Sequence, residues 1–158
     1  MSFYPIHDQL YSHRIFSIPD TPDVLTKEGG MAHIPYLMGV TKDDLFIPEG
    51  ASHREGGFFT AAVSFANACR KQDLPVYLYE FCHDLPGSSD GAFHSSELWY
   101  TFGTLDRCWR PMTDADHALA EKMVTCWTDF MKHGNPNSTG TNDWKPWTEE
   151  HPYVKTFA

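Results

Sequence analysis

Short apolar runs on either side of a helical pattern occupy the first half of the chain. Residues 34–40 form an apolar run bounded by Gly30 and by a polar stretch, and residues 76–81 form an aromatic-rich run introduced by Pro75. Both runs are short enough to be buried strands of a sheet that is covered on both faces. Between them, apolar residues recur at helical spacing over residues 58–70. The order strand, helix, strand predicts a parallel pair with a crossover helix.

The second half of the chain predicts one long helix and a terminal strand. Thr113 is a candidate N-cap with acids in the following turn, and apolar spacing near 3.6 continues to about His133. Gly134 fits the position after the helix, and Pro136 prevents continuation. The aromatic tail over residues 144–158 predicts a loop that ends in a strand.

The remaining segments are predicted to be mostly irregular. Prolines punctuate residues 3–33, which leave room for one short helical turn around residues 23–28. Residues 84–93 are a loop of Pro, Gly, Ser and Asp, after which an apolar pattern resumes over residues 97–102. The pattern as a whole predicts an α/β fold with about three strands and flanking helices.

Composition and charge narrow the class of protein. The 158 residues correspond to one domain, and 41% hydrophobic with 21% charged residues is a globular composition. A net charge of −9 argues against nucleic-acid binding, because an acidic surface repels phosphates. Four cysteines without a C-x-x-C pair predict free thiols and no zinc site. We expect neither a metal nor a cofactor. The N-terminal residues lack a signal-peptide pattern, so we expect a cytoplasmic protein unless a signal precedes this sequence. No run approaches 18 apolar residues, so we expect no membrane partner.

Two ionisable residues follow the predicted strands, at the carboxyl ends where α/β proteins bind ligands. Asp44 follows the run at residues 34–40, and His94 follows the run at residues 76–81 after a glycine-bearing loop. A histidine can take a proton from a serine hydroxyl, and a carboxylate can fix its tautomer. With nine histidines and 21 acids in the chain, this pairing alone does not exclude surface or structural roles.

Four segments resemble those of type-B carboxylesterases and cholinesterases, in the family's order. Residues 91–103, GAFHSSELWYTFG, resemble the segment around the catalytic histidine. Residues 34–44 resemble the segment that ends at the catalytic acid, commonly G-V-x-K-D-E-G. Residues 127–137 resemble a helix that ends in a G-N-P-N turn, and the later W-x-P-W at residues 144–147 is similar to the W-P that follows it.

The resemblance implies the C-terminal portion of an α/β-hydrolase sheet, with residues 1–158 as a single partial domain. It implies cleavage of small carboxylic esters through an acyl-serine, with His94 as general base and acid and Asp44 as the residue that orients it. Asp43 is the rival acid, with a solvated loop charge as its other interpretation. Glu97 matches a family glutamate and is interpreted either as support for the histidine or as a surface helix charge.

Two departures concern the loops. Less chain separates Asp44 from His94 than in cholinesterase-like members, and Leu45 replaces the glycine that often follows the acid. The short separation suggests a trimmed, bacterial-type esterase with a small cap region, and neither departure removes the acid or the histidine. The aromatic residues after the histidine could line an acyl pocket, but core packing is the favoured prediction for each of them: Trp99, Tyr100, Phe102 and Trp109.

A third departure concerns the nucleophile. Family members carry a G-E-S-A-G turn and a glycine-rich oxyanion loop before the acid segment, whereas no G-E-S-A-G occurs in these residues. The one G-x-S-x-G match, GSSDG at residues 87–91, comes after the acid segment, in the predicted loop 84–93. The serines near the histidine are interpreted as loop hydroxyls: Ser88, Ser89, Ser95 and Ser96. We therefore expect the acid and the histidine to be completed by an N-terminal esterase half, on another chain or on a longer protein. The chain alone is expected to be almost inactive.

The main alternative is a catalytically inactive remnant or a protein-interaction module of cholinesterase-like origin. A sheet cut between strands exposes one long edge, which invites self-association or a partner. A metal-dependent hydrolase is disfavoured, because neither H-E-x-x-H nor a Cys/His cluster occurs in the sequence.

Overall fold

The computed structural model describes residues 30–137, 140 and 143–158. The predicted helical turn around residues 23–28, and nearly all of the predicted irregular segment 3–33, lie outside the described residues. The elements in chain order are β1 (Tyr36–Thr41), η1 (His53–Glu55), α2 (Gly57–Arg70), β2 (Val76–Phe81), α3 (Leu98–Thr101), η2 (Leu105–Arg107), α4 (Asp114–His133) and β3 (Val154–Phe157).

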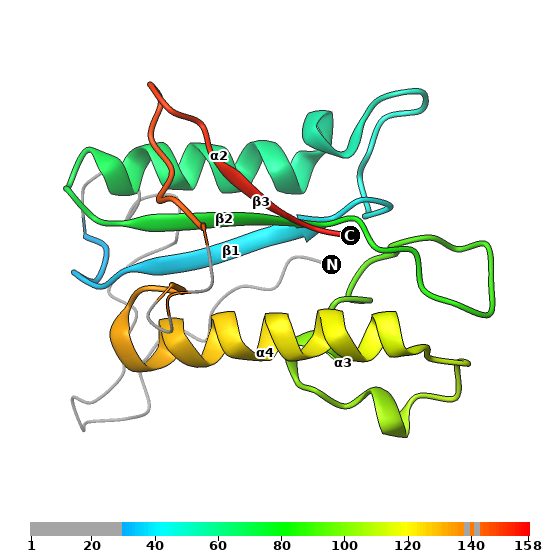
Figure 1. Cartoon of the computed structure of the whole chain (residues 1–158). Coiled ribbons are helices and arrows are strands. Elements are labelled where there is room, and N and C mark those ends of the chain that lie inside the picture. Colours follow the sequence, from blue (N-terminus) through cyan, green and yellow to red (C-terminus); the bar gives the residue numbers. More distant parts are fainter. Residues whose placement is uncertain (1–29, 138–139, 141–142) are drawn as a thin grey trace, which may run out of the picture.

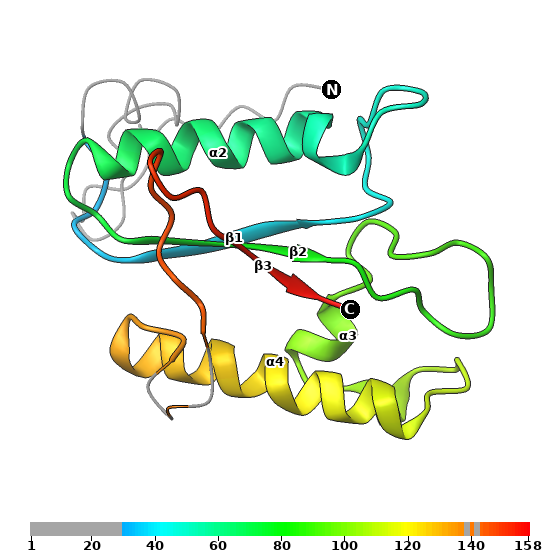
Figure 2. The same ribbon diagram turned by 45° about the horizontal axis from the view of Figure 1, so that its top comes forward.

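The three strands form one parallel sheet in the order β1-β2-β3. Helix α2 covers one face of the sheet and α4 covers the other, as Figures 1 and 2 show. Every residue of the central strand β2 is buried, which is what a strand with both faces covered requires. The predicted α/β arrangement of about three strands with flanking helices is confirmed.

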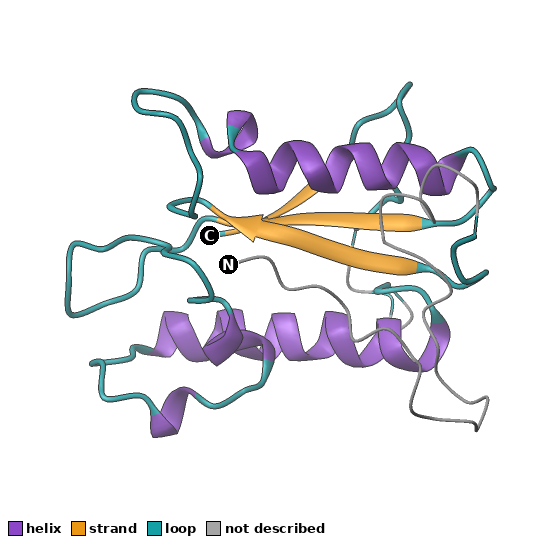
Figure 3. Cartoon of the chain, turned by 180° about the vertical axis from the view of Figure 1, so that it is seen from behind, coloured by secondary structure: helices purple, strands orange, loops and turns teal. Residues whose placement is uncertain are grey.

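Alternate side chains of β2 build a separate core on each face. Tyr77, Tyr79 and Phe81 pack in the cluster that contains residues of α4 and Trp144. Val76 and Leu78 pack in the cluster that contains residues of α2 and Trp147. Seen from behind in Figure 3, the strands lie between the two helical layers. This three-layer packing fixes the ends of the strands, where the candidate site lies.

Helix α4 begins and ends where the sequence predicts. Thr113 is its N-cap, and Asp116 returns a hydrogen bond by accepting the Thr113 N–H at 2.7 Å. Gly134 has φ +66°, and its N–H donates to the carbonyl of Phe130. A left-handed residue at this position ends a helix most easily when it is glycine.

Three details differ from the prediction. Strand β1 covers residues 36–41 rather than 34–40, because the ladder starts where the N–H of Tyr36 donates to the carbonyl of Pro75, and Ile34 is exposed. The short helix α3 had no predicted counterpart. The prediction of core packing was wrong for Phe102 and Trp109, which are exposed. The Arg110 guanidinium carbon lies 4.8 Å from the centroid of the Trp109 ring. Tyr100 is fully buried, as predicted.

Among the described residues, no helix is both long and apolar enough to cross a membrane.

Candidate active site

The loops that follow β1 and β2 meet beyond the C-terminal ends of these strands, because parallel strands end on the same side of the sheet (Figure 1). Beyond the last paired residues of β1 and β2, Asp43 forms an isolated parallel bridge with Phe93. The N–H of Asp43 donates to the carbonyl of Ala92 at 2.9 Å. The two loops are thus joined immediately before His94.

The imidazole of His94 and the carboxylate of Asp44 are hydrogen-bonded. His94 Nδ1 lies 2.6 Å from Asp44 Oδ1. Only 8% of the Asp44 side chain is exposed, against 49% of the His94 side chain. Among the described residues, no group hydrogen-bonds to the other ring nitrogen, Nε2. The pair therefore has a buried acid on one side of the ring and an accessible nitrogen on the other.

Backbone groups fix the Asp44 carboxylate in place. Its Oδ1 also accepts the N–H of Leu45 at 2.8 Å, and its Oδ2 accepts the N–H of Thr41 at 3.2 Å. Burial by itself would raise the pKa of Asp44, but the hydrogen bonds from Leu45, His94 and Thr41 outweigh it, so the pKa lies below its ordinary value. Asp44 is consequently a carboxylate at neutral pH.

An aromatic side chain packs against one face of the His94 ring. Phe58, in the first turn of α2, stacks on the imidazole with ring centroids 5.7 Å apart and an interplanar angle of 24°. Phe46 then meets Phe58 edge to face at 5.4 Å and adopts a left-handed backbone conformation with φ +61°. The imidazole is therefore restrained by a hydrogen bond at its edge and by a ring on its face.

Glu97 is half-buried, and no hydrogen bond joins it to His94. The Tyr79 hydroxyl lies 3.5 Å from Glu97 Oε1, and the other carboxylate oxygen is buried without a partner among the described residues. Burial raises the pKa of Glu97, and the charge of Asp44 raises it further. Glu97 is therefore not in the environment of an exposed helix charge. Its support of His94 stays a prediction.

The serine hydroxyls of the described residues do not complete the pair. None is hydrogen-bonded to His94. Ser88 Oγ accepts from the Arg110 guanidinium at 2.8 Å, and Ser96 Oγ is buried without a hydrogen-bond partner.

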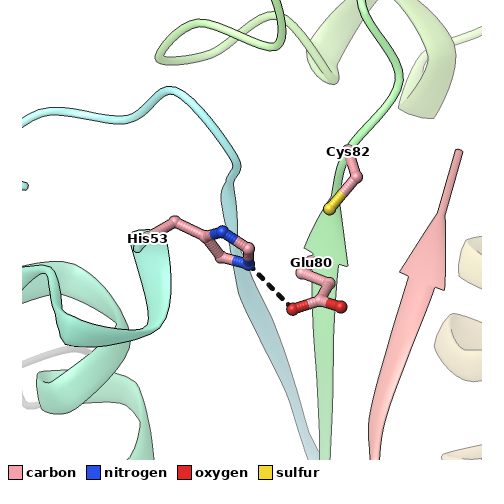
Figure 4. Close-up of side chains that lie close together, drawn as sticks. All are labelled: His53, Glu80 and Cys82. Carbon is pink, nitrogen blue, oxygen red and sulfur yellow. Dashed lines mark hydrogen bonds and ion pairs between the residues drawn. The ribbon is translucent and has the colours of Figure 1, made fainter. Parts of the chain in front are cut away.

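A second group of ionisable side chains lies at the end of β2, where Figure 4 shows His53 directed at Glu80 with Cys82 beyond. Their ligand-type atoms lie within 4.8 Å of one another. However, Glu80 already accepts hydrogen bonds from His53, from two nitrogens of Arg54 and from Thr156. Despite burial, these donors lower the pKa of Glu80 to about 2. A metal ion would have to displace the guanidinium, so the group is an ion-pair cluster that sequence reasoning missed.

Comparison with known proteins matches most of the chain to one protein family. The model described as "Carboxylesterase family" matches residues 52–157, a stretch that contains His94 and Glu97 and begins after Asp44. Para-nitrobenzyl esterase of Bacillus subtilis (strain 168) is 26% identical over 178 residues, covering 85% of this chain and 36% of that protein. Pyrethroid hydrolase Ces2e of Rattus norvegicus is 29% identical, covering 87% of this chain and 24% of that protein.

The solved structures that resemble the chain are also esterases. One described as a PNB esterase superposes with a TM-score of 0.71 at 25% identity and covers 89% of this chain and 38% of that chain. A thermophilic PNB esterase gives a TM-score of 0.71 at 26% identity. The chain thus spans well under half of the length of the relatives that it matches.

Proposed function

Because the chain belongs to the carboxylesterase family, we propose that it supplies the acid and the histidine of a serine carboxylic-ester hydrolase. The observation that carries this proposal is the 2.6 Å hydrogen bond between His94 Nδ1 and Asp44 Oδ1. It leaves Nε2 accessible for proton transfer. A buried carboxylate and a half-exposed imidazole are the arrangement that such an acid–base pair needs.

In the proposed reaction, His94 Nε2 accepts the proton of a serine hydroxyl while the hydroxyl oxygen attacks the ester carbonyl. The same nitrogen then donates that proton to the departing alkoxide, and a water molecule repeats the cycle on the acyl-serine. Asp44 keeps the proton on Nδ1 and stabilises the imidazolium that forms at each transfer. Its lowered pKa keeps it charged at neutral pH.

We further propose that the serine and the oxyanion hole lie outside these 158 residues. The family's G-E-S-A-G does not occur in the sequence, and the one G-x-S-x-G match, GSSDG at residues 87–91, lies in the loop after β2 rather than on a strand-to-helix turn. The match to para-nitrobenzyl esterase covers 36% of that protein. The completing part would be an N-terminal esterase segment, on a separate chain or on a longer protein, which would also contribute much of the pocket for a small ester.

The test is hydrolysis of p-nitrophenyl acetate by the purified chain, alone and combined with a segment of a family member that carries the G-x-S-x-G turn. We expect the combined protein to hydrolyse the ester and to lose about a thousandfold or more in kcat with His94→Ala. Glu49→Ala, which removes an exposed carboxylate in the loop after β1, is the matched control and should leave kcat unchanged. Hydrolysis by the chain alone that His94→Ala abolishes would contradict the proposed external nucleophile.

A second candidate function is association through the free edge of the sheet. Among the described residues, β1 pairs only with β2, so no described strand pairs with its other edge. Such an edge could pair with a completing esterase segment or with a second copy of the chain. Sedimentation velocity over a concentration series tests self-association, and a monomer at every concentration would exclude it.

A further inference from the structure

The backbone just before His94 is bound to the stretch that follows β1. The N–H of Lys42 still donates to the carbonyl of Phe81 in β2, at 2.8 Å. One residue later, the N–H of Asp43 donates instead to the carbonyl of Ala92, at 2.9 Å. Sheet pairing therefore passes from β2 to the loop that carries the histidine.

The Asp43 side chain adds a bond of its own to this junction. Its Oδ2 accepts the N–H of Ala92 at 2.8 Å, so both polar backbone groups of Ala92 are bound to Asp43. Ala92 is fully buried and cannot find water as a substitute. Lys42 Nζ lies 3.7 Å from the same oxygen and also pairs with Asp84, at the other end of the loop. Residues 42 and 43 thus hold both ends of the loop.

Gly91 allows the carboxylate to come this close. Its φ is +66°, and a Cβ atom at this position would lie 2.2 Å from Asp43 Oδ2. Any other residue would both strain the backbone and push the carboxylate away. The close approach of the Asp43 carboxylate therefore explains why residue 91 is glycine.

We propose that Asp43 is a positioning residue, whose carboxylate holds Ala92 and thereby sets His94 against Asp44. The two adjacent acids bind different groups and so have different tasks. Asp44 binds the imidazole, whereas Asp43 binds the backbone two residues before it. A shift of about 1 Å in that backbone would take the 2.6 Å hydrogen bond beyond normal length. This proposal rests on the proposed function, because the position matters only if His94 transfers protons.

The experiment observes the Nδ1 proton of His94 by NMR in the full chain labelled with 15N-histidine. The signal is assigned by its loss in His94→Ala. We expect Asp43→Ala to speed exchange of this proton with solvent about five- to tenfold, the effect of losing one hydrogen bond. Asp43→Asn should restore the slow exchange, because its amide oxygen can still accept from Ala92. Glu49→Ala removes an exposed carboxylate from the loop after β1 and should change nothing.

Three results would overturn the proposal. The first is unchanged exchange in Asp43→Ala with an intact fold by circular dichroism. The second is exchange in Asp43→Asn as fast as in Asp43→Ala, since charge rather than the acceptor would then matter. The third is unfolding of both variants, which would make Asp43 a general requirement of the fold. The measurement needs neither nucleophile nor ester, so failure of the esterase proposal would show up separately, in the hydrolysis assay.

Discussion

Replacing Glu80 with glutamine removes a buried carboxylate that accepts four hydrogen bonds. Arg54 donates two of them, at 2.9 and 2.8 Å, and Thr156 donates one at 2.7 Å. His53 Nε2 lies 2.9 Å away. These partners connect β2 to η1 and to β3. A glutamine would keep one acceptor oxygen but turn an NH2 group toward donors, leaving at least one of them unpaired.

The size of the effect follows from the pKa of Glu80. Its fall from the ordinary 4.5 to about 2 corresponds to about 3 kcal/mol of unfolding free energy at neutral pH. Arg54 is half-exposed and screened by solvent, which reduces the expected loss to about 2 kcal/mol. Because the folded pKa is depressed, this stability is present above pH 4.5 and is lost as the pH falls toward 2.

The assay is urea unfolding followed by tryptophan fluorescence, from neutral pH down to about pH 2. We expect Glu80→Gln to lower the free energy of unfolding at neutral pH, and we expect its difference from wild type to shrink in acid, where wild-type Glu80 is also protonated. Asp106→Asn is the control, since 93% of that side chain is exposed. A difference that stays constant with pH would refute the reasoning, because packing rather than charge would then cause it.

Three further predictions concern the core, a helix cap and the site. Met123→Ala should lower the free energy of unfolding in urea by about 2–5 kcal/mol, because the side chain is fully buried. Met131→Ala, on the exposed face of the same helix, should lower it by less than about 0.5 kcal/mol, and equal losses for the two variants would contradict the packing. Thr113→Ala should cost about 1 kcal/mol through loss of the N-cap, and an unchanged melting temperature would exclude that role. His94→Ala should raise the pKa of Asp44, measured by 13C NMR, since one hydrogen bond to the carboxylate is lost; an unchanged pKa would contradict the pairing.

Local signals explain why most of the fold could be predicted from the sequence. Strand β2 has the predicted bounds, 76–81, because its apolar run is continuous and Pro75 marks its start. The ends of α4 follow from Thr113 and Gly134, whose effects act within one helical turn. The one-turn helix α3 carries no such signal, since so short a helix depends on its packing.

The site was predictable only in part, for a physical reason. The order of acid and histidine, together with the family resemblance, predicted that Asp44 and His94 belong together, and the structure places them in contact. The contact of Asp43 with Ala92 and the cluster around Glu80 were not predicted, because their partners are far apart in sequence. Only the folded sheet brings Thr156 beside Glu80 or Ala92 beside Asp43.

Labelling with a fluorophosphonate, followed by mass spectrometry, tests the central claim most directly. The chain is combined with a segment that carries the G-x-S-x-G turn, with either His94 or His94→Ala in place. The account predicts a covalent adduct on the serine of that segment, formed about a thousandfold more slowly in His94→Ala. An adduct on a serine of this chain, or a labelling rate indifferent to His94, would contradict it.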